Sequence, residues 1–167
     1  MDEPSRGKEF RRRLEEATKY SEVWEVVKAT VEYVLKKHRR GMMLFLDDLP
    51  IRLGAYHPLG TNNIVLNRRL VEIVKASIKP RRVVNALIFN LLTHEYLHAL
   101  GKFSEKNVRK LVYEISKKSF GTDHITTAIA ERSPWALLKG IPLETTDAPK
   151  RVMEIVKDFE ETDRYII

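Results

Sequence analysis

The segment His94-Glu95-Tyr96-Leu97-His98 has the pattern H-E-x-x-H and is the part of the sequence best suited to chemistry. Two histidines four residues apart lie on one face of an α-helix, one turn apart, so both imidazoles can bind the same metal ion. Glu95 is rotated by about 100° from His94, so it can reach a water bound to that ion and act as a general base. The spacing predicts a catalytic site with one Zn²⁺ bound by His94 and His98.

Composition and context favour a metal site over a chance match. The chain has five histidines, and the chance that this pattern occurs somewhere in it is roughly one in seventy. Leu87 and Leu91 share a helical seam with His94 and His98, so the two rings face the core side of the helix and require polar partners. Two packed core histidines are the alternative interpretation. The chain has no cysteine, so disulfides, thiolate metal sites and cysteine nucleophiles are excluded.

A third zinc ligand is expected from a carboxylate. The longer pattern H-E-x-x-H-x-x-G-x-x-H is not completed, because Ser104 stands at its last position. A glutamate of the next predicted helix is therefore expected, and Glu114 in mid-helix is preferred over Glu105, whose place in the first turn the helix dipole explains. His124 is a further candidate, as a ligand or as a donor to a developing oxyanion; a packing role at a helix start is the alternative.

The elements that must position these residues follow from apolar periodicity and from turn residues. The sequence predicts an α+β fold with a core helix, a small three-stranded sheet, an active-site helix that carries H-E-x-x-H, a glutamate helix, and helical extensions at both ends. The helices are predicted over residues 5–19, 21–40, 67–79, 81–100, 104–119, 122–130 and 150–161, and the strands over 42–46, 51–56 and 63–67.

The charge is divided unevenly along the chain. The net charge is +7, but residues 1–120 carry +10 and residues 121–167 carry −3. An acidic tail folded back on a basic body is one interpretation, and ordinary variation on a charge-rich surface is the other. The basic body raises nucleic acid as a partner, but there is no recognisable nucleic-acid motif and no interleaving of aromatic and basic residues. Nucleic acid is therefore disfavoured.

Length and hydropathy indicate one cytoplasmic domain. A chain of 167 residues fits one compact domain with extensions, and no secretory signal or apolar run of membrane-spanning length is readable. A membrane partner is therefore not expected. The high content of Lys, Glu and Arg without cysteine is typical of thermophilic proteins.

Three segments, 51–58, 63–67 and 93–101, carry a family resemblance, and the last of them contains the H-E-x-x-H motif. They resemble the minigluzincins, small soluble archaeal zinc metallopeptidases of the proabylysin type, over about residues 21–132. The resemblance implies a compact zincin-like fold in which His94, His98 and a downstream glutamate bind zinc. It also implies that Glu95 activates a water for hydrolysis of a peptide or protein substrate.

The same resemblance suggests a latent form, in which a C-terminal segment occupies the cleft in cis or in trans. We therefore divide the chain into an N-terminal extension at 1–20, a peptidase domain at 21–132 and an acidic, autoinhibitory tail at 133–167. The chain is longer than the family at both ends, so the position of the tail is not carried over. Self-association into a homo-oligomer stays open.

The predicted sheet offers a place for an extended substrate. The strand 63–67 is expected at the sheet edge, where Ile64 and Val65 would bind a peptide by strand addition. An edge strand that merely faces solvent is the alternative.

Two other functions are weighed against a peptidase. The first is a non-catalytic zinc-binding scaffold, but a structural site has no need of Glu95 and normally closes the fourth position. The second is the nucleic-acid-binding module already disfavoured above.

Overall fold

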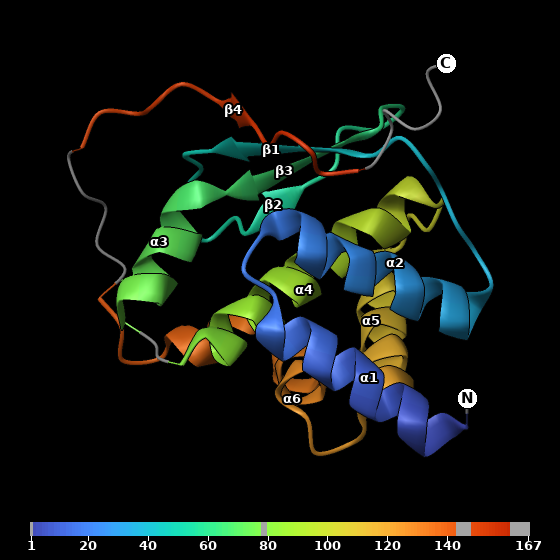
Figure 1. Ribbon diagram of the computed structural model, residues 1–167. Coiled ribbons are helices and arrows are strands. Elements are labelled where there is room, and N and C mark those ends of the chain that lie inside the picture. The colour runs from blue at the N-terminus through green and yellow to red at the C-terminus, as the bar shows by residue number, and fades with distance from the viewer. Residues whose placement is uncertain (1, 78–79, 143–147, 161–167) are drawn as a thin grey trace.

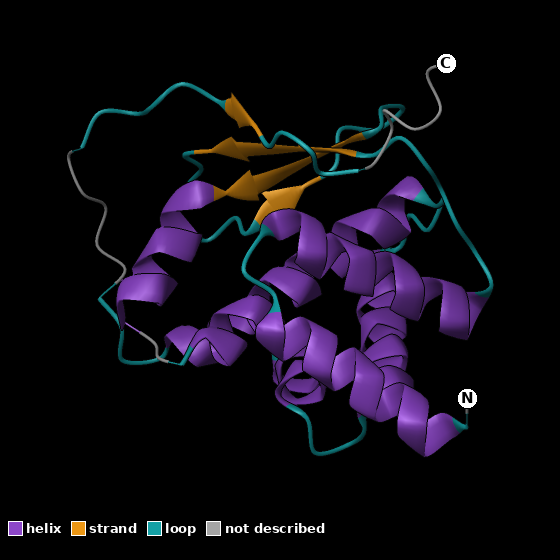
Figure 2. Cartoon of the chain, in the orientation of Figure 1, coloured by secondary structure: helices purple, strands orange, loops and turns teal. Residues whose placement is uncertain are grey.

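The computed structural model describes residues 2–77, 80–142 and 148–160. Over these residues the fold is α+β, with six α-helices gathered on one side of a small mixed sheet (Figures 1 and 2). The helices are α1 (Glu3–Glu16), α2 (Tyr20–Leu35), α3 (Arg68–Ser77), α4 (Arg81–Ala99), α5 (Glu105–Phe120) and α6 (Ile125–Arg132), followed by the 3-10 helix η1 (Pro134–Leu138). The strands are β1 (Met43–Asp47), β2 (Ala55–Tyr56), β3 (Asn63–Asn67) and β4 (Glu154–Ile155).

The sheet has the strand order β2-β3-β1-β4. The central strands β1 and β3 are parallel, and β2 and β4 are antiparallel to their neighbours. The prediction that 63–67 is an edge strand is wrong, because β3 pairs on both sides. A signal was present in the sequence: Ile64, Val65 and Leu66 are apolar in succession, which is typical of a strand buried on both faces.

The strand β4 occupies a segment for which the sequence predicted a different structure. A helix was expected over residues 150–161, but Glu154 and Ile155 pair with β1, and the Val156 amide donates to the Leu44 carbonyl at 2.9 Å. The open edge of β1 offers this segment tertiary hydrogen bonds, which override its local helix propensity. Among its described residues, the C-terminal extension is helical only from Pro134 to Leu138, and the sheet has four strands rather than three.

Helix α4 lies at the centre of the molecule. It contacts α1, α2, α5 and α6 as well as β2 and β3, and most of its residues are buried. Trp24 of α2 packs edge-on against Tyr96 of α4, with ring centroids 4.8 Å apart. Asn85 ties the end of α1 to α4 by donating to the carbonyls of Leu14 and Ala17 at 2.9 and 2.8 Å. The helix that carries the H-E-x-x-H motif is thus held from several sides.

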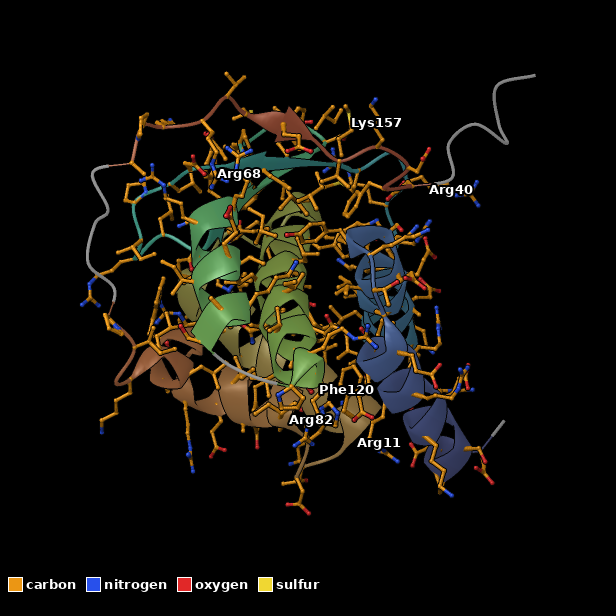
Figure 3. The ribbon with its side chains drawn as sticks, turned by 60° about the vertical axis from the view of Figure 1, so that its left-hand side comes forward. Arg11, Arg40, Arg68, Arg82, Phe120 and Lys157 are labelled. Carbon is orange, nitrogen blue, oxygen red and sulfur yellow. The ribbon has the colours of Figure 1, made fainter. Side chains whose placement is uncertain are left out.

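Helix α1 is also fixed to α5. The Arg11 guanidinium donates to the Phe120 carbonyl at 2.9 Å, and Figure 3 shows the two residues close together at one end of the helical layer. Phe10 and Leu14 of α1 belong to the same hydrophobic core as the central helix. The division of the chain at residues 20 and 132 stays a prediction.

The described C-terminal residues 148–160 form what we call the strap, which runs along the β1 edge of the sheet (Figure 1). At one end Arg151 binds the buried Asp48 carboxylate, with nitrogen–oxygen distances of 2.9 and 3.0 Å. At the other end the ring of Phe159 stacks on Trp24, and the Glu160 carboxylate accepts from the Trp24 indole at 2.8 Å. The strap therefore lies on the sheet edge opposite β2.

Asp48 makes the attachment of the strap sensitive to acid. Hydrogen bonds from Arg151, and from Arg68 at 3.0 Å, hold the pKa of the Asp48 carboxyl well below its ordinary value, against the opposing effect of burial. Arg68 extends from α3 toward this point (Figure 3). A depressed folded-state pKa means that this contribution to stability is complete above the unfolded-state pKa of about 3.9 and declines as the pH falls below it.

We predict that Asp48→Asn flattens the acid limb of the stability profile. The wild-type free energy of unfolding should fall between about pH 5 and pH 2 more steeply than that of the variant, because the amide takes up no proton. Urea denaturation at a series of pH values measures this. Asp123→Asn, at an exposed carboxylate, is the control and should keep the wild-type slope. Parallel acid limbs for wild type and Asp48→Asn would contradict the prediction.

Candidate metal centre and cleft

Three side chains converge at the C-terminal end of α4. The Nε2 atoms of His94 and His98 lie 2.9 and 2.7 Å from the two carboxylate oxygens of Glu105. These three residues are the group of potential metal ligands found among the described residues, with ligand atoms all within 4.8 Å of one another. Two imidazole nitrogens and a carboxylate are the ligand set of many catalytic zinc sites.

The turn between α4 and α5 places Glu105 there. Gly101 has a positive φ of 96°, and the Lys102 amide donates back to the Leu97 carbonyl at 3.0 Å, which closes the end of α4. The Ser104 hydroxyl then accepts from the Asn107 amide and caps α5. This short turn sets the first residue of α5 against the last turn of α4.

The structure therefore disagrees with the preference for Glu114 as the third ligand. Glu114 is nine residues further along α5, or about 13 Å along the helix axis, and is not part of the convergent group. Distance from the turn between α4 and α5 decides which carboxylate meets the histidines, and the mid-helix position of Glu114 places it too far along α5. Glu105, the other glutamate considered, meets them.

The ring nitrogens of His94 and His98 that face Glu105 can bind a cation. His98 Nδ1 donates to the Lys102 carbonyl at 2.7 Å, so in the neutral ring Nε2 carries the lone pair that faces Glu105. Two acceptors at this distance require a proton or a metal ion between them. Burial lowers the pKa of His94, which favours the neutral ring that a metal needs, while Glu105 opposes the shift. The chemistry of the three side chains thus fits Zn²⁺.

Glu95 lies beside this centre in an apolar setting. Its side chain is buried, with 8% of the residue exposed, and burial raises its pKa to about 7 although His98 opposes the shift. A carboxyl with a pKa near neutrality can both accept and release a proton under ordinary conditions. Its environment is therefore suited to general acid–base chemistry.

His94, Glu95 and Glu105 open into a cleft of about 570 Å³. Its walls come from the segment before β2, from α4 and α5, and from the end of α6 with the start of η1. The other lining residues are Arg52, Leu53, Gly54, Ala55, Asn90, Leu91, Arg109, Val112, Ala130, Glu131, Arg132, Ser133, Pro134 and Trp135.

His124 does not line the cleft. Its ring stacks on Phe120 with centroids 4.9 Å apart, and Nδ1 accepts from the Thr126 amide at the start of α6. Nε2 lies 3.6 Å from Glu15 of α1. The structure therefore gives His124 a packing and capping role, the alternative considered from the sequence, and does not bring it to the metal centre.

Ile64 and Val65 are also absent from the cleft walls. They lie on the interior strand β3, with exposed fractions of 0% and 3%, and have no free edge for an added strand. The sheet edge at the cleft is β2 with the residues just before it, from Arg52 to Ala55. The prediction that Ile64 and Val65 offer a free strand edge is therefore wrong, and β2 is the edge strand at the cleft.

Asn90 is a cleft residue that the sequence analysis missed. It stands four residues before His94, on the helical seam shared by Leu87, Leu91 and the two histidines. A polar residue that interrupts an otherwise apolar stripe one turn before a metal motif was the signal that could have identified it.

Gly54 allows α4 to approach the segment before β2. A Cβ atom on residue 54 would lie 2.7 Å from Leu91 Cδ2 and 3.4 Å from Cδ1. We predict that Gly54→Ala lowers the free energy of unfolding by about 1–3 kcal/mol through overpacking. In a Leu91→Ala background the same change should cost less than about 0.5 kcal/mol, because the clashing atoms are gone. Urea denaturation of the four proteins measures both values, and equal costs in the two backgrounds would refute the clash.

Comparisons with known proteins identify no relative. No protein-family model, no curated protein and no solved structure matches the chain. Within the described ranges, no helix combines the length and the apolar character needed to cross a bilayer.

Proposed function

We propose that the protein is a zinc-dependent metallopeptidase of the gluzincin type, in which His94, His98 and Glu105 hold the metal and Glu95 is the general base. One observation carries the proposal: both carboxylate oxygens of Glu105 lie within 3 Å of the two histidine Nε2 atoms, at the mouth of a cleft. The resemblance of three sequence segments to the minigluzincins points to the same class.

The chain's own residues supply most of the proposed chemistry. Bound zinc would act as a Lewis acid on the scissile carbonyl and lower the pKa of water in its coordination sphere. Glu95 accepts a proton from the attacking water and transfers it to the nitrogen of the leaving amine. Burial raises the pKa of the Glu95 carboxyl, which strengthens it as a base toward the attacking water. His98, oriented by the Lys102 carbonyl, keeps its Nε2 lone pair directed at the centre.

The cleft distinguishes this proposal from a non-catalytic zinc scaffold. A structural zinc site is normally closed by four protein ligands, whereas here three converge beside an open volume and a buried carboxyl. We propose peptides as substrates because β2 presents a sheet edge to the cleft, where an extended chain can add.

Latency through the C-terminal segment remains a separate proposal. Ser133, Pro134 and Trp135 line the cleft, so the start of the predicted tail forms part of its wall. The strap, by contrast, is fixed at the opposite edge of the sheet. A tail that blocks the cleft in cis would therefore involve residues other than 148–160.

The test is metal content together with metal-dependent hydrolysis. Protein purified without added metal should contain about one zinc per chain by elemental analysis, and it should cleave members of a mixed peptide library. Chelation should abolish cleavage and added Zn²⁺ should restore it. Zinc binding without cleavage of any peptide would favour the scaffold, and absence of zinc binding would refute both functions.

A further inference from the structure

The cleft continues along α4 beyond the metal centre and reaches Asn90. Asn90 is one turn before His94, about 6 Å along the helix axis, and only 5% of the residue is exposed. Its side-chain amide makes no hydrogen bond to any described residue. Its amide atoms are not among the fully buried side-chain atoms that lack a partner, so they keep contact with solvent in the cleft. The amide is therefore available to a group that enters the cleft.

The cleft that Asn90 lines also has apolar walls. They are formed by Leu91 of α4, Val112 of α5, Ala130 of α6 and the half-buried Trp135 of η1. A ligand side chain that reaches Asn90 must pass these apolar residues and carry a polar group at its end. A ligand side chain with an apolar end would leave the Asn90 amide unpaired, so the site would bind such a side chain less tightly.

The charges that line the cleft favour a negative tip. Arg52, Arg109 and Arg132 all contribute to the lining, and none of them forms an ion pair with a residue in the described part of the chain. The three carboxylates that line the cleft differ from one another in burial and in their partners. Glu105 is held by the two histidines, Glu95 is buried, and Glu131 alone is exposed without such a partner.

Arg109 is the lining cation that comes from α5, the helix that also carries Glu105. It follows Glu105 by four residues on α5, so the two side chains share one face of the helix, above the cleft. The pKa of His94 is lowered mainly by burial, and the charge of Arg109 adds a smaller lowering effect, in agreement with a position of Arg109 close to the centre.

We propose that Asn90 and Arg109 form a specificity subsite for an acidic side chain of the peptide substrate. The Asn90 amide donates a hydrogen bond to the carboxylate, and Arg109 supplies the compensating charge. The apolar walls hold the methylene groups of the side chain. The inference rests on the proposed peptidase function, since it names the substrate that this cleft selects.

Binding can be measured without turnover. The probes are acetylated and amidated pentapeptides, Ala-Ala-Xaa-Ala-Ala with Glu, Gln or Leu at the centre, whose blocked ends carry no charge. The full chain with Glu95→Gln is titrated with each peptide, and tryptophan fluorescence reports binding. Trp135 lines the cleft whereas Trp24 is fully buried, so the change reports Trp135.

We expect the Glu peptide to bind about tenfold more tightly than the Gln peptide, and more tightly still than the Leu peptide. Adding Arg109→Gln should bring the Glu and Gln peptides to within about twofold of each other. Adding Asn90→Leu should weaken both and tighten the Leu peptide. Lys110→Gln, which removes a neighbouring exposed charge outside the cleft, should leave all three affinities unchanged.

The outcomes separate this inference from the function on which it rests. Equal affinity for the three peptides, no binding of any of them, or a preference that survives Arg109→Gln would overturn the subsite. Selective binding that Arg109→Gln abolishes supports the subsite even if wild-type protein hydrolyses nothing, in which case the peptidase function fails. Hydrolysis without selectivity leaves the peptidase and removes the subsite.

Discussion

Glu95→Gln should lower kcat/KM for peptide hydrolysis by about a hundredfold to ten-thousandfold while the protein still binds zinc. The amide has the size of the carboxyl but cannot accept a proton, and general acid–base catalysis contributes about 10²–10⁴-fold to enzymatic rates. Because Glu95 is not a member of the convergent ligand group, the loss should appear in kcat and not in metal affinity. Initial rates with a fluorogenic peptide, together with zinc content by elemental analysis, measure the two effects separately.

The fold should tolerate this change. Burial raises the pKa of Glu95 to about 7, so its ionised form is not stabilised by the surrounding protein, and a neutral isostere should preserve the thermal midpoint. Glu114→Gln makes the same chemical change on α5, outside the ligand group, and is the matched control. Unimpaired hydrolysis by the zinc-loaded Glu95→Gln protein would show that Glu95 is not the base.

The second large effect concerns the third ligand. Glu105→Ala should weaken zinc binding by at least about a hundredfold, because even loss of a residue that only orients a ligand costs about 10–100-fold in affinity. Glu114→Ala should leave the affinity unchanged, since Glu114 lies about 13 Å further along α5. Competition with a chromophoric zinc chelator gives both dissociation constants.

The thermal midpoint gives a second measure of the difference in zinc affinity between Glu105→Ala and Glu114→Ala. A ligand at one hundred times its dissociation constant stabilises the folded state by about 2.7 kcal/mol. Added Zn²⁺ should therefore raise the thermal midpoint of wild type and Glu114→Ala but not of Glu105→Ala at the same concentration. The side chain of Glu105 is 62% exposed, so its removal should not itself unfold the protein. The reverse pattern would restore Glu114 as the ligand.

The prediction for Glu105 depends on the turn at residues 100–104, which the sequence indicates only in part. The sequence predicts that one helix ends at residue 100 and that the next begins at residue 104, and the structure confirms these two signals, with Gly101 at a positive φ and Ser104 as the N-cap of α5. These two signals indicate where the helix before the turn ends and where the helix after it begins. They do not indicate which part of the second helix lies against the first, so Glu105 and Glu114 both remained candidates for the third ligand.

The sheet shows the same limit. The segment 63–67 was predicted with the bounds that the structure has, because its apolar run and flanking polar residues are local signals. Its place inside the sheet was missed, since strand order depends on pairings between segments far apart in sequence. The strap illustrates this most clearly: residues 154–155 became a strand only because β1 had a free edge, more than one hundred residues earlier.

The sequence by itself determined that two imidazoles and a carboxyl lie close together on one helix. The i, i+4 spacing of His94 and His98 on a helix, with Glu95 between them, is a local geometric consequence of helix periodicity, and the absence of cysteine leaves histidine and carboxylate as the strong ligands. Only the tertiary structure decided that Glu105 faces the histidines, that β2 forms the edge at the cleft, and that Asn90 and Arg109 line it. These are contacts between elements, and they depend on the turns that reverse the chain and on packing around α4.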